Sequence, residues 1–310
     1  MYRPESTDSV GRPQKPAPSV ASPVIAAVDG SENGNHALEW ALAQARLSNA
    51  ALHIVHARLY ANTLSATVAG EPSQEDPVLR RVRATVERRE ALPPVEYLSL
   101  PGAPEEVLPQ LGDHARLMVL GARGRGGFAS LLLGSNGLAC AGRAACPVVV
   151  VPRAEPPLWE PHGQIVLGVN GTCPDAATTA FAFQEASRRG AKLQVVTAYS
   201  WPGPLSDALY DEEAAEQEVR ASAEAHLRPF VDFHPEVPVE LLAAPGDAAG
   251  HLVSASQAAD LVVIGRHRHR PLSAQLGSVT NAVLLHANCP VAVIPPAEGS
   301  VPTPALPAEN

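Results

Sequence analysis

The sequence LMVLGARGRGGFASLLLGS, residues 117–135, places glycines between a short apolar run and a segment typical of a helix. Gly121 is followed after two residues by Gly124, and after nine more by Gly134 and Ser135. A strand that ends in glycines and leads into a helix is a common phosphate site in α/β proteins. Glycine admits φ > 0 and lets backbone N–H groups approach an anion, and the helix start adds further N–H groups and a positive dipole end. The stretch therefore predicts an α/β fold with an anion-binding loop.

The chain contains an internal repeat that includes this stretch. VIAAVDGS at 24–31 recurs as IVLGVNGT at 165–172, and ACPVVVVP at 145–152 recurs as NCPVAVIP at 288–295. The segment at 103–124 is echoed at 246–268. These segments recur at offsets of 141 to 144 residues, so each copy has the size of a whole domain rather than of a solenoid repeat.

Within each copy, short runs of Val, Ile and Leu alternate with longer amphipathic segments, which is typical of a parallel sheet covered on both faces. For the first copy we predict strands at 23–28, 51–57, 95–100, 116–120 and 148–151, and helices at 36–48, 77–91, 105–114 and 136–144. For the second we predict strands at 164–169, 192–198, 237–242, 261–264 and 291–294, and helices at 176–189, 211–233, 248–258 and 279–286. Right-handed crossovers then give two tandem doubly wound α/β domains.

The expected domains span residues 23–152 and 164–295. Residues 1–22 and 296–310 are rich in Pro, Ser, Glu and Ala without an apolar period, so we expect disordered tails. The connecting segment 153–163 contains three prolines and predicts a stiff, extended linker.

Composition excludes several classes of protein. A net charge of −9 argues against a nucleic acid or an anionic membrane surface as the main partner. The four cysteines are too few and too irregularly spaced for a disulfide framework. The N-terminal residues lack the apolar core of a secretory signal, and no apolar run approaches the roughly 20 residues of a membrane span. We expect a soluble, cytoplasmic protein.

The sequence resembles the universal stress protein family. The resemblance rests on the first-copy start VIAAVDGS, on GARGRGGFASLLLGS at 121–135 and on CPVVVVP at 146–152, and it covers nearly the whole chain outside the tails. The glycine motif of the first copy matches the signature of the ATP-binding subgroup. The resemblance implies five-stranded parallel sheets in the order 3-2-1-4-5, domain pairing along the last strand, and a cytoplasmic role in stress or dormancy.

It also implies a nucleotide site in the first copy, with ATP, possibly together with Mg²⁺, held rather than rapidly hydrolysed. Asp29 would face the nucleotide and accept a hydrogen bond from a ribose hydroxyl or the adenine amine. The small Ala57 would line the adenine pocket. The base and ribose would lie against Leu120 and Gly121, and the phosphates would contact Gly124, Gly134, Ser135 and Asn136. Arg123 and Arg125 are candidate charge partners for the outer phosphates.

The second copy departs from this motif. Its loop, GRHRHRPLSAQLGS at 265–278, is one residue shorter and carries Arg268 in place of the inner glycine, while Asn170 replaces the aspartate. Gly265, Gly277 and Ser278 are retained, with Val279 at the next position of the expected helix. Two interpretations stay open here: a modified site held by arginine and histidine side chains, or a domain that has lost ATP and kept its fold. Histidines in this loop would make such a site pH-sensitive.

Several residues in the first copy also have a purely structural interpretation. Asp29 is a candidate turn former or helix cap before Gly30-Ser31. His56 is expected to pack at a strand end. Cys140 and Cys146 are expected to pack as small apolar groups rather than act in redox chemistry.

No nucleophile–base pair, carboxylate pair, metal cluster or GxxxxGK[ST] motif is visible in the sequence. We therefore expect an ATP-binding regulator without substantial catalysis, which works alone or with an unknown protein partner. A slow ATP hydrolase and a nucleotide-free interaction scaffold are the alternatives. The resemblance further implies that strands 148–151 and 291–294 pair antiparallel, either within one chain or between the chains of a homodimer, which would also cover open sheet edges.

Overall fold

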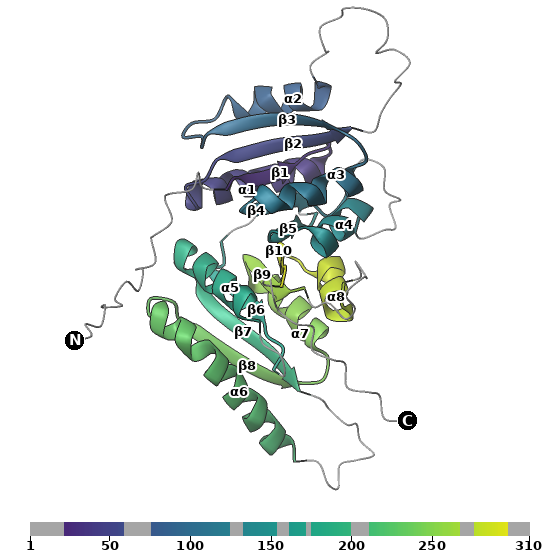
Figure 1. Cartoon of the computed structure of the whole chain (residues 1–310). Helices are drawn as coiled ribbons and strands as arrows, with labels where there is room; N and C mark the ends of the chain where they lie inside the picture. The colour runs from purple at the N-terminus through teal and green to yellow at the C-terminus, as the bar shows by residue number, and fades with distance from the viewer. Residues whose placement is uncertain are drawn as a thin grey trace, which may run out of the picture.

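The computed structural model describes residues 22–58, 76–124, 133–153, 161–171, 175–199, 211–266 and 276–296. The expected tails, except residues 22 and 296, and most of the linker lie outside them. The described residues form one ten-stranded sheet with helices on both faces (Figure 1). Its strand order is β3-β2-β1-β4-β5-β10-β9-β6-β7-β8. Each half therefore has the predicted order 3-2-1-4-5, and the two-domain α/β fold is confirmed.

The first half has strands and helices in strict alternation. They are β1 Val24–Ala27, α1 Glu32–Leu47, β2 Leu52–Arg58, α2 Pro77–Val86, β3 Val95–Pro101, α3 Pro104–Gln110 with the 3₁₀ turn Leu111–His114, β4 Leu117–Gly121, α4 Ser135–Arg143 and β5 Val148–Val151.

The second half repeats this order. Its elements are β6 Gln164–Gly168, α5 Ala176–Arg189, β7 Lys192–Tyr199, α6 Glu212–Phe233, β8 Val239–Pro245, α7 Ala248–Ala255 with the 3₁₀ turn Ser256–Ala258, β9 Leu261–Gly265, α8 Ser278–His286 and β10 Val291–Ile294.

Two predicted helix boundaries in the first half are wrong. Helix α1 begins four residues before the expected residue 36, because Ser31 caps it with its hydroxyl, which accepts from the N–H of Gly34 at 3.1 Å. Helix α2 ends at Val86, five residues earlier than expected. Beyond that end, Ala91 has a φ of +53°, a left-handed conformation that does not continue an α-helix.

The two halves join through an antiparallel pair of strands, β5 and β10. Val149 lies opposite Ala292, flanked by Val150 opposite Val291 and Val148 opposite Val293. All other pairings in the sheet are parallel. The predicted antiparallel pairing therefore occurs within one chain, and it turns two five-stranded sheets into a continuous one.

The core forms one layer on each face of this joined sheet. One apolar cluster lies under α1, α2, α5 and α6, and the other lies under α3, α4, α7 and α8, each with residues from both halves. Cys140, Cys146 and Cys289 are buried in the second cluster, where burial raises the pKa of each thiol to about 12. They are packed thiols, as expected for Cys140 and Cys146, and they stay protonated at neutral pH.

A buried arginine also crosses from the second half to the first. Arg266 follows β9 and is 6% exposed. Its Nη1 donates to the carbonyl oxygens of Ala141, at 3.1 Å, and Ala144, at 2.9 Å, at the C-terminal end of α4. A cation is favoured there because the helix dipole places partial negative charge at that end.

Candidate functional site

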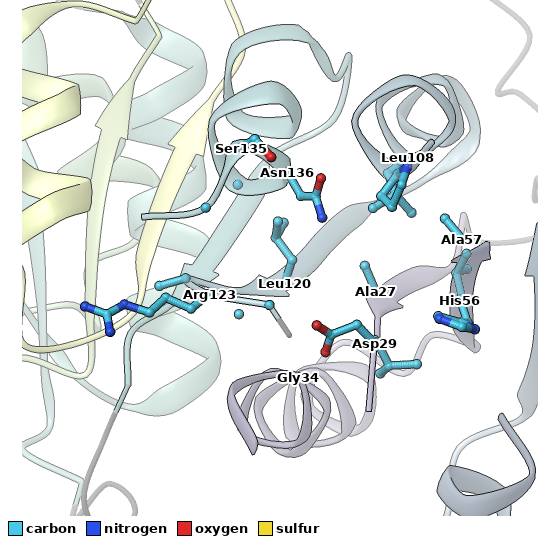
Figure 2. A pocket seen from close by; sticks show the side chains of 18 of the residues that line it. Ala27, Asp29, Gly34, His56, Ala57, Leu108, Leu120, Arg123, Ser135 and Asn136 are labelled. Atoms are coloured by element: carbon cyan, nitrogen blue, oxygen red, sulfur yellow. The ribbon is translucent and has the colours of Figure 1, made fainter. Parts of the chain in front are cut away.

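A cavity of about 520 Å³ opens at the carboxyl ends of β1 and β4 in the first half. These strands are neighbours whose connections run to opposite sides of the sheet, which is the usual ligand position in doubly wound folds. The volume lies within the range of small-molecule sites. The described lining residues are Ala27, Val28, Asp29, Gly34, Val55, His56, Ala57, Pro104, Leu108, Leu120, Gly121, Ala122, Arg123, Gly124, Leu133, Gly134, Ser135, Asn136 and Gly137 (Figure 2).

Asp29 forms a turn and borders the cavity at the same time. Its Oδ1 accepts from the backbone N–H of Ser31 at 2.9 Å and from the Ser31 hydroxyl at 2.6 Å. Gly30 completes the turn with a φ of +75°, which glycine adopts without strain. The cap of α1 is Ser31 and not Asp29, so Asp29 combines two of the roles considered for it: it makes the turn, and its carboxylate lines the cavity.

Gly121 and Gly124, at the end of β4 and the start of its loop, are constrained by close contacts rather than by backbone conformation. A Cβ on Gly124 would lie 2.7 Å from Oδ2 of Asp29, and one on Gly34 would lie 2.8 Å from Oδ1. A Cβ on Gly121 would lie 2.7 Å from the carbonyl oxygen of Asn33 in α1. The expected positive φ is wrong for Gly121, Gly124 and Gly134, none of which adopts it. Gly121 and Gly124 let β4 and the start of its loop pack against α1 and the Asp29 carboxylate, whereas a Cβ on Gly134 would make only an ordinary contact, 3.5 Å from the carbonyl oxygen of Ala122.

Helix α4 begins at the cavity, as the sequence predicts. Its cap residue is Gly134, which has no side chain to bond the N–H groups of the first turn. Those N–H groups have no partner within the helix itself. Ser135 and Asn136 occupy that turn, and the Asn136 amide is directed toward Leu120 and the interior of the cavity (Figure 2). The arrangement offers backbone and side-chain donors to an anion.

The opposite part of the cavity is apolar. Ala27, Val55, Ala57, Leu108 and Leu120 line it from β1, β2, α3 and β4. The small side chains at 27 and 57 leave the space between the strand ends open (Figure 2). A flat apolar ring fits this part of the cavity, while polar groups fit the part near Asp29 and α4.

Arg123 lines the cavity, but its guanidinium points away from Asp29 and Asn136, toward the side where the second half lies (Figure 2). Arg125 lies outside the described residues. The structure therefore brings all nine of the described site residues predicted for the first copy to one cavity, although the guanidinium of Arg123 is directed away from Asp29 and Asn136 (Figure 2).

A polar cluster beside the cavity is one the sequence did not predict. Asp76 is buried, caps α2, and accepts at Oδ2 from Ser99 Oγ at 2.8 Å, while His56 Nδ1 lies 2.7 Å from the same oxygen. Burial raises the pKa of Asp76, but hydrogen bonds from His56, Ser99 and the N–H of Val78 outweigh it and hold the pKa below its usual 3.8. Asp76 immediately before Pro77 is a helix-start signal that could have identified the cap, whereas its pairing with His56 depends on tertiary packing.

Among the described residues, little space remains at the corresponding place in the second half. The cavity there measures about 10 Å³ and is lined by Gly168, Val169, Asn170, Asp175, Thr178, Thr179 and Gly265. A Cβ on Gly168 would lie 3.1 Å from both Leu252 and Ile264. Leu252 and Ile264 are the repeat counterparts of Leu108 and Leu120, so these side chains close over the position that stays open in the first half.

Of the predicted second-copy residues, only Gly265 lines that small cavity. Gly277 caps α8, Ser278 is its first residue, and Val279 packs against the apolar cluster. The loop residues between 267 and 275, including Arg268 and both histidines, lie outside the described residues.

The described ranges contain no group of three or more His, Cys, Asp or Glu side chains placed to hold a metal ion. None of their helices combines the length and apolar character needed to cross a membrane.

Comparisons with known proteins identify the family. The model of the universal stress protein family matches residues 22–152 and again residues 162–295. Universal stress protein Rv2005c of Mycobacterium tuberculosis is 33% identical over 288 residues, covering 87% of this chain and 96% of that protein. The crystal structure of PA1789 from Pseudomonas aeruginosa, described as functionally unknown, matches with a TM-score of 0.63 at 17% identity, covering 89% of this chain and 93% of that one.

A universal stress protein solved in complex with cAMP also matches, at 28% identity and a TM-score of 0.36, over 44% of this chain and the whole of that one. The chain described here belongs to the universal stress protein family, with two family domains in tandem.

Proposed function

We propose that the first half of this universal stress protein binds ATP, with Mg²⁺, and that the protein acts as a nucleotide-dependent regulator in stress or dormancy rather than as an efficient enzyme. The observation that carries the proposal is the cavity of about 520 Å³, which combines an apolar slot, a carboxylate and an uncapped helix start. Each of these features matches a different part of an adenine nucleotide.

The adenine ring would lie in the apolar slot, between Ala57 and Leu120. Asp29, whose Oδ1 already accepts hydrogen bonds from Ser31, would accept a further hydrogen bond from a ribose hydroxyl. The phosphates would lie on the N–H groups at the start of α4, near Ser135 and Asn136, where the helix dipole favours negative charge. Gly124 and Gly134 would allow the backbone to approach the phosphates closely.

Mg²⁺ would be held mainly by the phosphates and water, since it typically takes one or two protein carboxylates beside substrate phosphates. Asp29 is the carboxylate among the described lining residues. When bound, the ion would neutralise phosphate charge in a protein that is itself strongly negative.

A ligand of this kind would regulate by binding alone. Nucleotide that binds only the ordered cavity stabilises that state by an amount set by its concentration and dissociation constant. It would thereby shift the balance between conformations that partner proteins distinguish. We place the nucleotide in the first half, because Leu252 and Ile264 close the corresponding space in the second half.

The test is to identify and count the nucleotide. Native mass spectrometry of the purified chain, and titration calorimetry after nucleotide removal, are expected to give one ATP per chain. Phosphate release followed over a day at saturating ATP and Mg²⁺ distinguishes a protein that only binds ATP from a slow ATP hydrolase. No copurified nucleotide and no thermal shift at millimolar ATP would contradict the proposal and favour an interaction scaffold. Two nucleotides per chain would contradict the assignment to the first half.

A further inference from the structure

A buried polar contact lies where the two halves meet. On α1, Gln44 is 3% exposed, and on α5, Glu185 is fully buried. The side-chain amide of Gln44 donates from Nε2 to both carboxylate oxygens of Glu185, at 3.0 and 2.9 Å. This is the contact from which the inference is drawn.

Gln44 and Glu185 are the same position in the two copies of the repeat, 141 residues apart. Val149 and Ala292, opposite one another in the β5–β10 pair, are also counterparts, 143 residues apart. Residues that face their own counterparts lie on a twofold axis. Both pairs therefore lie on the pseudo-twofold axis that relates the halves.

The side chain that lies opposite a residue on such an axis depends on which two halves have paired. If two first halves paired, Gln44 would face a second Gln44. If two second halves paired, Glu185 would face a second Glu185, so two buried carboxylates would repel one another and neither would receive the amide hydrogens that Gln44 donates. Only the mixed pair places two amide hydrogens on a carboxylate.

The cations around the contact are also present on one side only. Arg188 and Arg189 of α5 form ion pairs with Glu185, and Nη2 of Arg189 donates to Oε1 of Gln44 at 2.6 Å. The corresponding positions of α1 are Leu47 and Ser48. The mixed contact is thus complete: the carboxylate has its donors, and the amide has both a donor partner and an acceptor partner.

We propose that the Gln44–Glu185 contact sets partner choice at the joining surface, so that the second half pairs with a first half and discriminates against another copy of itself. The sheet then closes within one chain instead of joining like halves of two chains. This inference does not depend on nucleotide binding.

A double-mutant cycle on the full chain tests the contact. Gln44→Glu places two carboxylates on the axis and is expected to lower Tm by about 10 °C. The double variant Q44E/E185Q restores one amide facing one carboxylate, with Arg189 still beside position 44, and should recover at least half of that loss. The matched control is Gln184→Glu, which makes the same change at an exposed position of α5, next to Glu185, and should leave Tm nearly unchanged.

Partner choice itself is measured with a single cysteine on the axis. In a chain whose native cysteines are replaced by alanine, Ala292→Cys can form a disulfide between chains only where two second halves pair. After oxidative refolding at equal protein concentration, we expect about tenfold or more covalent dimer when Glu185→Gln is added, because the carboxylate repulsion between like halves is gone. The cysteine-free chain gives the background.

Dimer yields that do not change with Glu185→Gln, or a Q44E loss that the double variant does not recover, would overturn the proposal. The first result would show that the contact does not select a partner. The second would show that Gln44 acts only through local packing.

Discussion

The two halves of this protein share every strand and helix but differ in the space at the ends of their central strands. In the first half, Ala27, Leu108 and Leu120 leave a cavity of about 520 Å³. In the second, Leu252 and Ile264 approach Gly168 to within contact distance, and about 10 Å³ remains. The same topology therefore supports an open site and a closed one. The difference lies in how a few side chains pack around one strand end.

The comparison also shows how the halves became interdependent. Arg266 of the second half bonds the end of α4, whose start lines the cavity of the first half. The counterpart of Arg266 in the first half is Ala122, which cannot reach across. This contact therefore has no counterpart, and it runs only from the closed half to the open one.

The largest effect is expected at the contact that shapes the open site. Gly124→Glu places a side chain on the Asp29 carboxylate, 2.7 Å from the position of its Cβ, and adds a negative charge near the phosphates. ATP affinity measured by calorimetry should fall about 1,000-fold or more, about 4 kcal/mol. Gly277→Ala, in the second half, should leave affinity unchanged. An unaltered circular dichroism spectrum separates lost binding from lost folding, and full ATP binding by a folded G124E chain would refute the assigned site.

The next test compares the two leucines. Leu252→Ala removes a buried side chain that packs beside Gly168, and it should lower the free energy of unfolding by about 3 kcal/mol. Leu108→Ala should cost less, about 1–2 kcal/mol, because its side chain already borders an open cavity. Urea denaturation without nucleotide measures both. Equal losses would mean that the closed half is not better packed than the open one.

Arg266→Ala tests the contact that runs only from the closed half to the open one. It leaves the carbonyl oxygens of Ala141 and Ala144 without their buried donor, and we expect a loss of about 2 kcal/mol in urea denaturation. Arg220→Ala, which removes an exposed ion pair on α6, serves as control and should cost less than about 0.5 kcal/mol. A loss no greater than the control would show that Arg266 does not stabilise the join.

The smallest effect concerns the caps of the counterpart helices α2 and α6. The pKa of Asp76 is lowered in the fold, so its ionised form stabilises the protein above pH 3.8, and this contribution is lost as pH falls through the lowered pKa. Asp76→Asn should cost about 1 kcal/mol at pH 7 and progressively less below pH 4. Thermal unfolding of both chains from pH 7 to pH 2 checks this. A constant difference at all pH values would contradict it. Asp211→Asn, at the exposed cap of α6, should cost less at pH 7.

Much of the architecture could be predicted from the sequence because local sequence patterns specify it. The runs of Val, Ile and Leu specify buried parallel strands, and the repeat specifies two similar units. The glycines predicted to cradle phosphate do line the first cavity, but the positive φ expected of them is absent. Gly121 and Gly124 are instead constrained by Asn33 and Asp29, which belong to a different part of the chain. Helix ends were predicted less well, since Ser31 and Ala91 decide them individually.

The sequence by itself determined the fold class and the duplication, because these follow from residue type and spacing along the chain. Its resemblance to the family indicated the antiparallel pairing of strands 148–151 and 291–294 and nine of the residues that line the first cavity. Tertiary structure alone decided that this pairing is internal, that Gln44 meets Glu185, that His56 meets Asp76, and that Leu252 closes the second site. Each of these depends on which side chains from distant segments occupy the same volume, and sequence spacing does not specify that.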